Sequence, residues 1–121
     1  MVYLVTAEVI KMKGECPVHK VGDKVEFYEN VMKGKMCLSA FRAMWLSIVS
    51  LMYDSKVAWL KGQDSTVQQC PDPAADVIFL VKRGRELSDE ELAQAYGITV
   101  DEYRRLMGRD IMQTLRQRGE I

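Results

Sequence analysis

Apolar and polar residues follow two different periods along this chain, and the first is that of a β-sheet. Residues 1–12 are mostly apolar with polar residues interleaved, and no glycine interrupts them before Gly14, which predicts a strand. Residues 24–28 alternate apolar and polar side chains, as a strand with one buried face does. Residues 77–81 are an uninterrupted apolar run after a proline-rich turn, and they predict a further strand.

The second period is that of an amphipathic helix and covers residues 38–53. Apolar side chains recur there every three or four positions, which places them on one stripe. The stripe contains Phe41, Met44, Trp45, Ile48, Leu51 and Met52. We expect Trp45 to be buried in the core as a member of this stripe. The segments that connect the strands and this helix are expected to be loops: 14–23, 30–36 and 54–69.

After Gly84 the pattern becomes helical. Two capping boxes stand in this part of the chain, Ser88-x-x-Glu91 and Thr99-x-x-Glu102. In a capping box a hydroxyl and a carboxylate three residues later satisfy free amides at the start of a helix. Gly97 fits the end of the first of these helices. A third helical stretch is expected at residues 109–118.

These elements together predict an α+β fold. We expect a small, mostly antiparallel sheet of about three or four strands with one central helix and a helical C-terminal extension. The core domain covers residues 1–83 and the extension residues 84–121. A small sheet leaves one face and its edges uncovered, and association of identical chains is one way to cover them. A homo-oligomer is therefore expected.

Composition and charge limit the partners. The 121 residues include 17 Lys+Arg and 17 Asp+Glu, so the formal net charge is zero, and bulk electrostatics gives no attraction to nucleic acid or to an anionic membrane. The longest apolar helical segment, 36–53, is interrupted by Arg42 and is shorter than the roughly 20 residues of a membrane span. The N-terminus lacks the basic region of a signal peptide. We expect no membrane partner, and nucleic acid is not a favoured partner.

Three cysteine motifs occur in order along the first part of the chain. They are Cys16-Pro17-x-His19-Lys20-Val21-Gly22-Asp23, Cys37-x-x-Ala40-Phe41 and Cys70-Pro71-Asp72-Pro73. In this order, over about residues 1–83, they resemble a family of small uncharacterised proteins, mostly from anaerobic bacteria and archaea. The resemblance implies a shared fold and shared cysteine positions, and it implies no reaction. Residues 84–121 lie outside the usual length of that family.

The cysteines and the histidine are the best candidates for chemistry. Three cysteines are a poor disulfide framework, which favours a reducing, cytoplasmic location where thiols stay free or bind metal. Cys16 and His19 have the spacing of a ligand pair, and Cys37 and Cys70 could complete a set for zinc or iron if the fold brings the loops together.

Two other interpretations of these residues stay open. Cys37 and Cys70 could be small buried apolar residues, with His19 forming a hydrogen bond in a turn. Cys37 could instead be a reactive thiol, because it lies at or beside the start of a helix, where free amides stabilise a thiolate. No complete catalytic signature is present. The sequence therefore leaves open whether the protein is an enzyme and which small-molecule ligand it has, if any.

Residues 88–118 contain a pattern that resembles a helix-turn-helix, as in DNA-binding regulators. Its positions are Leu92, Ala93, Gly97, Ile98, Thr99, Tyr103 and Leu106. From Gly84 to Ile121 there are six arginines, no lysine and eight acidic residues, a net charge of −2. The expected recognition helix also begins with Asp101 and Glu102, whose charges would repel phosphates. We therefore expect a helical appendage that packs on the sheet or on a second subunit.

Overall fold

The computed structural model describes all residues, 1–121, and the chain forms two compact units. The first unit is Met1–Leu87 and the second is Ser88–Ile121. The boundary falls after Leu87 rather than after residue 83, because the last strand of the sheet continues as far as Glu86.

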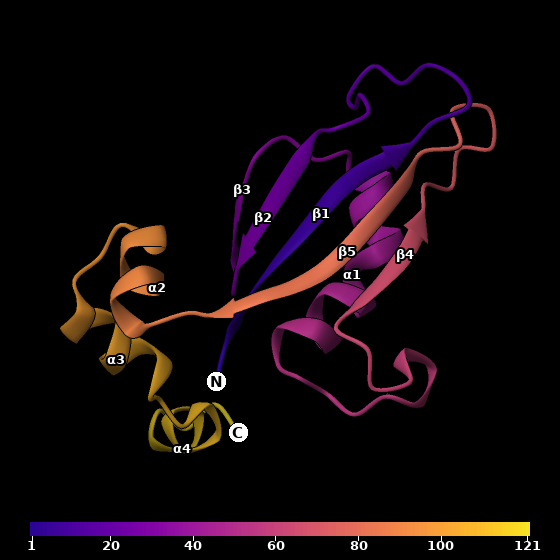
Figure 1. Cartoon of the computed structure of the whole chain (residues 1–121). Helices are drawn as coiled ribbons and strands as arrows, with labels where there is room; N and C mark the ends of the chain where they lie inside the picture. The colour runs from indigo at the N-terminus through magenta and orange to yellow at the C-terminus, as the bar shows by residue number, and fades with distance from the viewer. The chain divides into compact units, whose positions relative to one another are not determined.

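The first unit is built on a five-stranded sheet in which all neighbouring strands are antiparallel (Figure 1). Its strands are β1 (Tyr3–Lys11), β2 (Lys24–Tyr28), β3 (Val31–Lys33), β4 (Ser65–Gln69) and β5 (Ile78–Glu86). The strand order is β3-β2-β1-β5-β4, so the first strand of the chain lies in the centre of the sheet. The expected α+β class is confirmed.

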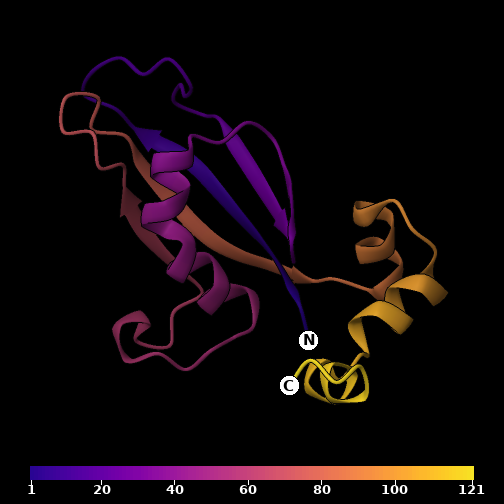
Figure 2. The same cartoon turned by 180° about the vertical axis from the view of Figure 1, so that it is seen from behind.

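Helix α1 (Leu38–Met52) lies on one face of the sheet, and the core of the unit lies between them (Figure 2). Side chains alternate between the two faces of a strand, so Val5, Ala7 and Val9 of β1 all point toward this helix and are at most 1% exposed. The helix contributes Ala40, Met44, Ile48, Leu51 and Met52 to the same core. Burial of each valine, isoleucine, leucine or methionine side chain among them stabilises the fold by about 1.5–3 kcal/mol.

Trp45 does not belong to this core. It is 44% exposed, so the expectation that it would be buried is wrong. A helix turns by about 100° per residue, and Met44 takes the inward position, so Trp45 is directed to the side of the helix. Its ring packs there against Phe41, with the ring centroids 5.4 Å apart.

Two of the five strands lie where loops were expected, β3 within residues 30–36 and β4 within residues 54–69. A short 3-10 helix, η1 (Ala58–Leu60), precedes β4. β3 has only three residues, and β4 reads Ser-Thr-Val-Gln-Gln. Both are edge strands, which pair on one side only and can be short and polar. Their sequences therefore lack the apolar alternation by which the other strands were recognised.

The second unit contains three short helices, α2 (Asp89–Tyr96), α3 (Val100–Met107) and α4 (Ile111–Gln117). Both predicted capping boxes are formed, and in each the hydroxyl oxygen accepts a hydrogen bond of 3.1 Å from the amide three residues later. Gly97 ends α2 in the left-handed conformation, with φ of 75°. In neither unit is there a helix with the length and apolar character needed to cross a membrane.

Candidate functional site

Three connecting segments meet at one end of the sheet, beside the first turn of α1 (Figure 1 and Figure 2). The loop after β1 contacts the loop between β4 and β5, because the Gly14 amide donates a hydrogen bond of 3.1 Å to the Ala75 carbonyl. A Cβ atom on Gly14 would lie 2.3 Å from the Ala74 carbonyl oxygen, so only glycine permits this approach. The four predicted site residues lie on these segments: Cys16, His19, Cys37 and Cys70.

His19 is the centre of this region. Its side chain is 1% exposed, and its ring lies perpendicular to that of Phe79 in the core, with ring centroids 5.1 Å apart. The Nε2 atom accepts a hydrogen bond of 3.1 Å from the Cys37 backbone amide. Cys37 is the N-cap residue of α1. His19 therefore joins the loop after β1 to the start of the helix.

The Cys16 thiol lies beside His19 in a tight turn. Its Sγ accepts hydrogen bonds of 3.4 Å from the backbone amides of Val18 and His19. The two intervening residues therefore form a tight turn in which the Cys16 sulfur contacts the His19 backbone, and the use of both side chains as a ligand pair stays a prediction. Cys70 packs against the apolar core, and no hydrogen bond connects its thiol to the other three residues.

No group of three or more His, Cys, Asp or Glu side chains lies close enough together to hold a metal ion. The three thiols are free. The lone pair of His19 Nε2 and the sulfur of Cys16 already accept hydrogen bonds from the backbone. In this arrangement Cys16 and His19 stabilise the loop after β1 through hydrogen bonds to the backbone. A metal site formed by Cys16, His19, Cys37 and Cys70 stays a prediction.

The environment of His19 favours the neutral imidazole. Burial lowers the pKa of His19; the carboxylate of Asp23 raises it, and the charge of Lys35 lowers it. Because Nε2 accepts a hydrogen bond, we assign the proton of the neutral ring to Nδ1. Nδ1 has no hydrogen-bond partner and lies 3.9 Å from Asp23 Oδ2. A second proton, on Nε2, would face the Cys37 amide and remove that hydrogen bond.

In the second unit a tight turn joins α2 to α3. The turn between α2 and α3 is residues 97–99, and the Ile98 amide donates to the Ala93 carbonyl at 3.0 Å. Ala93 is buried together with Leu92 and Tyr103. The rings of Tyr96 and Tyr103 stack with centroids 5.8 Å apart. Leu92, Ala93 and Tyr103, which the sequence pattern selects, are thus the buried residues of these two helices.

The second unit has a negative net charge, but most of its acidic residues are engaged in helix caps or ion pairs, whereas most of its arginines form no ion pair. Arg104 forms ion pairs with Asp89 at 2.9 Å and Glu90 at 3.7 Å. Further acidic residues cap helices: Glu91, Glu102 and Asp110. Four arginines form no ion pair with an acidic residue: Arg105, Arg109, Arg116 and Arg118. The sequence signal for this was the segment 104–118, which contains five arginines and one acidic residue.

Two of these arginines share a hollow. Arg109 and Arg118 line a depression of about 240 Å³ together with Thr114 and two apolar side chains. Arg109 Nε donates to the Leu106 carbonyl at 2.8 Å, which anchors the side chain at the end of α3. Two arginine residues therefore line one hollow of this unit.

Comparison of the chain with protein-family models, with curated protein sequences and with solved structures finds no match.

Proposed function

We propose that the protein binds nucleic acid through the helix-turn-helix of residues 88–118. The observation that supports this is the agreement of pattern and geometry at the junction of α2 and α3. A small buried residue, Ala93, stands where the two helices approach, and Gly97 makes the turn in the left-handed conformation. In DNA-binding proteins with this motif the second helix, here α3, enters the major groove.

The distribution of charge gives further support. The acidic residues of the unit stand mainly at helix N-termini, where amides and Arg104 compensate them. The unpaired arginines stand later in the sequence, from α3 to the residue after α4. Arginine is suited to phosphate, because its planar guanidinium donates two parallel hydrogen bonds to one oxyanion. Contacts to the backbone of nucleic acid would position the protein, and α3 would supply any contacts to bases.

The proposal is tested by titrating the whole protein into short fluorescent duplex DNA and measuring anisotropy at increasing salt. We expect the association constant to fall steeply with salt, because each phosphate contact releases a counterion. The double variant Arg109→Ala/Arg118→Ala should bind several-fold more weakly, and its salt dependence should be reduced by about one unit of slope per lost contact.

A charge-matched control is available in the first unit. Arg42→Ala/Lys82→Ala also removes two exposed positive charges, which lie on α1 and β5. This variant should bind DNA as the unchanged protein does. Absence of binding at low salt, or an equal loss in both double variants, would contradict the proposal.

We propose a homodimer as the form that binds. Proteins with this motif commonly use a two-fold pair of units to contact two half-sites about one helical turn of DNA apart. Light scattering at the concentrations used for DNA binding should give twice the mass of the 13.9 kDa chain. A monomeric mass in the presence of bound DNA would contradict this part of the proposal.

A second candidate function is binding of zinc or iron by Cys16, His19, Cys37 and Cys70. One observation favours it: the Cys16 sulfur accepts hydrogen bonds from the backbone amides of Val18 and His19, in the turn that carries the buried His19 side chain. Hydrogen bonds of this kind commonly orient metal ligands. Binding would require the loops to close further and the Cys37 amide to release Nε2.

Metal analysis of protein purified without an affinity tag tests this second candidate. We expect one zinc or iron per chain and its loss in Cys16→Ser and in His19→Gln. Thiol alkylation should also slow when zinc is added, because coordinated sulfur reacts poorly. No retained metal, together with alkylation that zinc does not change, would exclude this site.

A further inference from the structure

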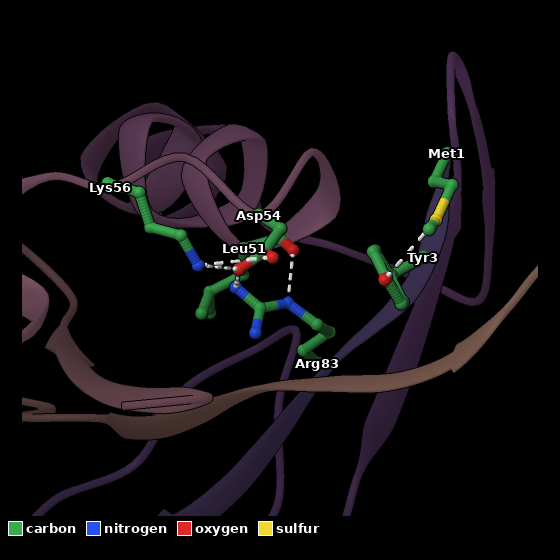
Figure 3. Close-up of polar contacts among 6 residues, drawn as sticks. All are labelled: Met1, Tyr3, Leu51, Asp54, Lys56 and Arg83. Carbon is green, nitrogen blue, oxygen red and sulfur yellow. Dashed lines mark hydrogen bonds and ion pairs between the residues drawn. The ribbon is translucent and has the colours of Figure 1, made fainter. Parts of the chain in front are cut away.

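A hollow of about 180 Å³ lies at the C-terminal end of α1, in the first unit. Residues 54–63, which follow the helix, form most of its wall, and Arg83 of β5 completes it. Figure 3 shows Arg83 beside Asp54, Lys56 and the Leu51 carbonyl. The start of α1, where the Cys37 amide contacts His19, is at the opposite end of the helix.

Arg83 is held rigidly at this hollow. Its Nε donates to the Leu51 carbonyl at 2.7 Å, and Nη2 lies 3.0 Å from Asp54 Oδ1 (Figure 3). The side chain is only 16% exposed, and its Cζ lies 5.5 Å from the centre of the Tyr3 ring. A guanidinium has five N–H donors, and these two contacts leave most of them available. Arg83 is therefore a fixed, mostly buried cation that still has N–H groups available to donate to a ligand.

Positive charge exceeds negative charge around the hollow. Its lining includes Lys56, Lys61 and Arg83 but only one acidic residue, Asp54. Asp54 already contacts both Lys56, at 3.2 Å, and Arg83. Lys61 has no acidic partner, and it stands in the left-handed conformation before Gly62, which turns the loop around the hollow. The lining thus contains one carboxylate and three cations, an excess of positive charge that attracts a second anion.

We propose that this hollow binds a single phosphate group, either as inorganic phosphate or as the phosphate of a small metabolite. Arg83 would donate hydrogen bonds to the anion, and Lys61 and Lys56 would supply charge. The volume is below the roughly 300 Å³ of pockets that enclose drug-sized ligands, so the hollow holds the phosphate and leaves the rest of a metabolite outside. The proposal concerns only the first unit and does not depend on nucleic-acid binding by the second.

Tryptophan fluorescence provides the measurement. Trp45 and Trp59 are the two tryptophans of the chain, and Trp59 lies in η1, within the loop that forms the hollow. Inorganic phosphate and glycerol phosphate are titrated into the whole protein at pH 7.5 and constant ionic strength, with chloride as the balancing ion. We expect a saturable change in fluorescence and a rise in the unfolding temperature, since a ligand that binds only the folded state stabilises it.

Matched lysine variants show whether the hollow is responsible. Lys61→Ala should weaken phosphate binding several-fold, and because Lys61 is exposed and makes no ion pair, the fold should survive. Lys82→Ala removes a neighbouring exposed charge from the opposite face of β5 and should leave binding unchanged. Tighter binding of glycerol phosphate than of inorganic phosphate identifies a metabolite as the ligand, and equal binding identifies the free anion. Equal effects of chloride and phosphate, or an equal loss in both variants, would overturn the proposal.

Discussion

The two units of this chain are stabilised in different ways. Met1–Leu87 buries an extensive apolar core between α1 and strands that are distant in sequence. Ser88–Ile121 buries few side chains, and its helices are fixed by two capping boxes, a glycine turn and the ion pairs of Arg104. Units below about 40 residues rarely bury enough surface to be stable on this basis alone. In Ser88–Ile121, local hydrogen bonds therefore determine where the helices begin and end, while the burial of apolar side chains contributes little to the free energy of unfolding.

The largest effect is expected from the core of the first unit. Phe79 is 1% exposed and contacts the His19 ring. Phe79→Ala should lower the free energy of unfolding by about 3–5 kcal/mol, because it removes buried surface and leaves a cavity. Both tryptophans lie in this unit, so their fluorescence during urea unfolding measures it directly. A midpoint that does not move would contradict the assignment of Phe79 to the core.

A smaller effect, confined to the other unit, is expected from Leu92→Ala. Leu92 is 2% exposed and is one of the few buried residues of this unit. We expect a loss of about 2 kcal/mol, at the low end for buried leucine, because a small core can collapse around the gap. Circular dichroism should lose helical signal at lower urea concentrations, while the tryptophan transition stays in place. Parallel shifts of both signals would show that the units unfold together.

The first unit should also respond to pH through His19, the only histidine of the chain. Burial lowers its pKa in the folded protein, whereas the unfolded chain takes up the proton near pH 6.5. The contribution of the neutral ring to stability is therefore complete above about pH 6.5 and is lost as the pH falls through the folded-state pKa.

Urea midpoints from tryptophan fluorescence at pH 7.5 and pH 5.5 measure this dependence. His19→Gln serves as the control, because its amide oxygen can still accept from the Cys37 amide but does not titrate. The midpoint of the unchanged protein should fall more between these two pH values than that of the variant. Equal falls would show that other groups cause the dependence.

The smallest of these effects is expected from the caps. Thr99→Ala removes the acceptor for the Glu102 amide at the start of α3 and should cost about 1 kcal/mol. Thr99→Ser keeps the hydroxyl and should cost much less. The measurement is the helical signal of the whole protein at increasing temperature. If serine and alanine had the same effect, the hydroxyl would not be the stabilising group.

The sequence predicts closely those helices and strands whose pattern depends on a few neighbouring residues. β2 was expected at residues 24–28 and lies there, α1 ends one residue earlier than expected, and both capping boxes begin helices. These signals depend on alternation, helical period or cap chemistry, which a few neighbouring residues determine.

Features that depend on distant partners were missed. β5 continues beyond residue 81 into the polar segment 82–86 because β1 offers a partner as far as Tyr3. β4 contains mostly polar residues and exists because it pairs with β5. The hollow at Arg83 was missed for the same reason, since Arg83 and the loop 54–63 are far apart in sequence.

The candidate site was predicted in part. The turn that joins Cys16 to His19 follows from their spacing, and the position of Cys37 at the start of α1 follows from the helical period. The hydrogen bond from the Cys37 amide to His19 could not be foreseen, because it depends on how the loop after β1 meets the helix. The net charge of the C-terminal unit follows from the sequence. That most of its acidic residues cap helices or form ion pairs is known only from the structure.

The central place of β1 in the sheet has a consequence for how the chain is made. β1 leaves the ribosome before the other strands of the sheet, and β2 can pair with it next, since β2 is the following strand along the chain. The other edge of β1 stays unpaired until β5 is synthesised, in which Arg83 pairs with Val5. Such distant pairing is slow, and an unpaired edge is a template for a strand of another chain. The interval between the synthesis of β2 and that of β5 is therefore when the nascent chain is most open to mispairing.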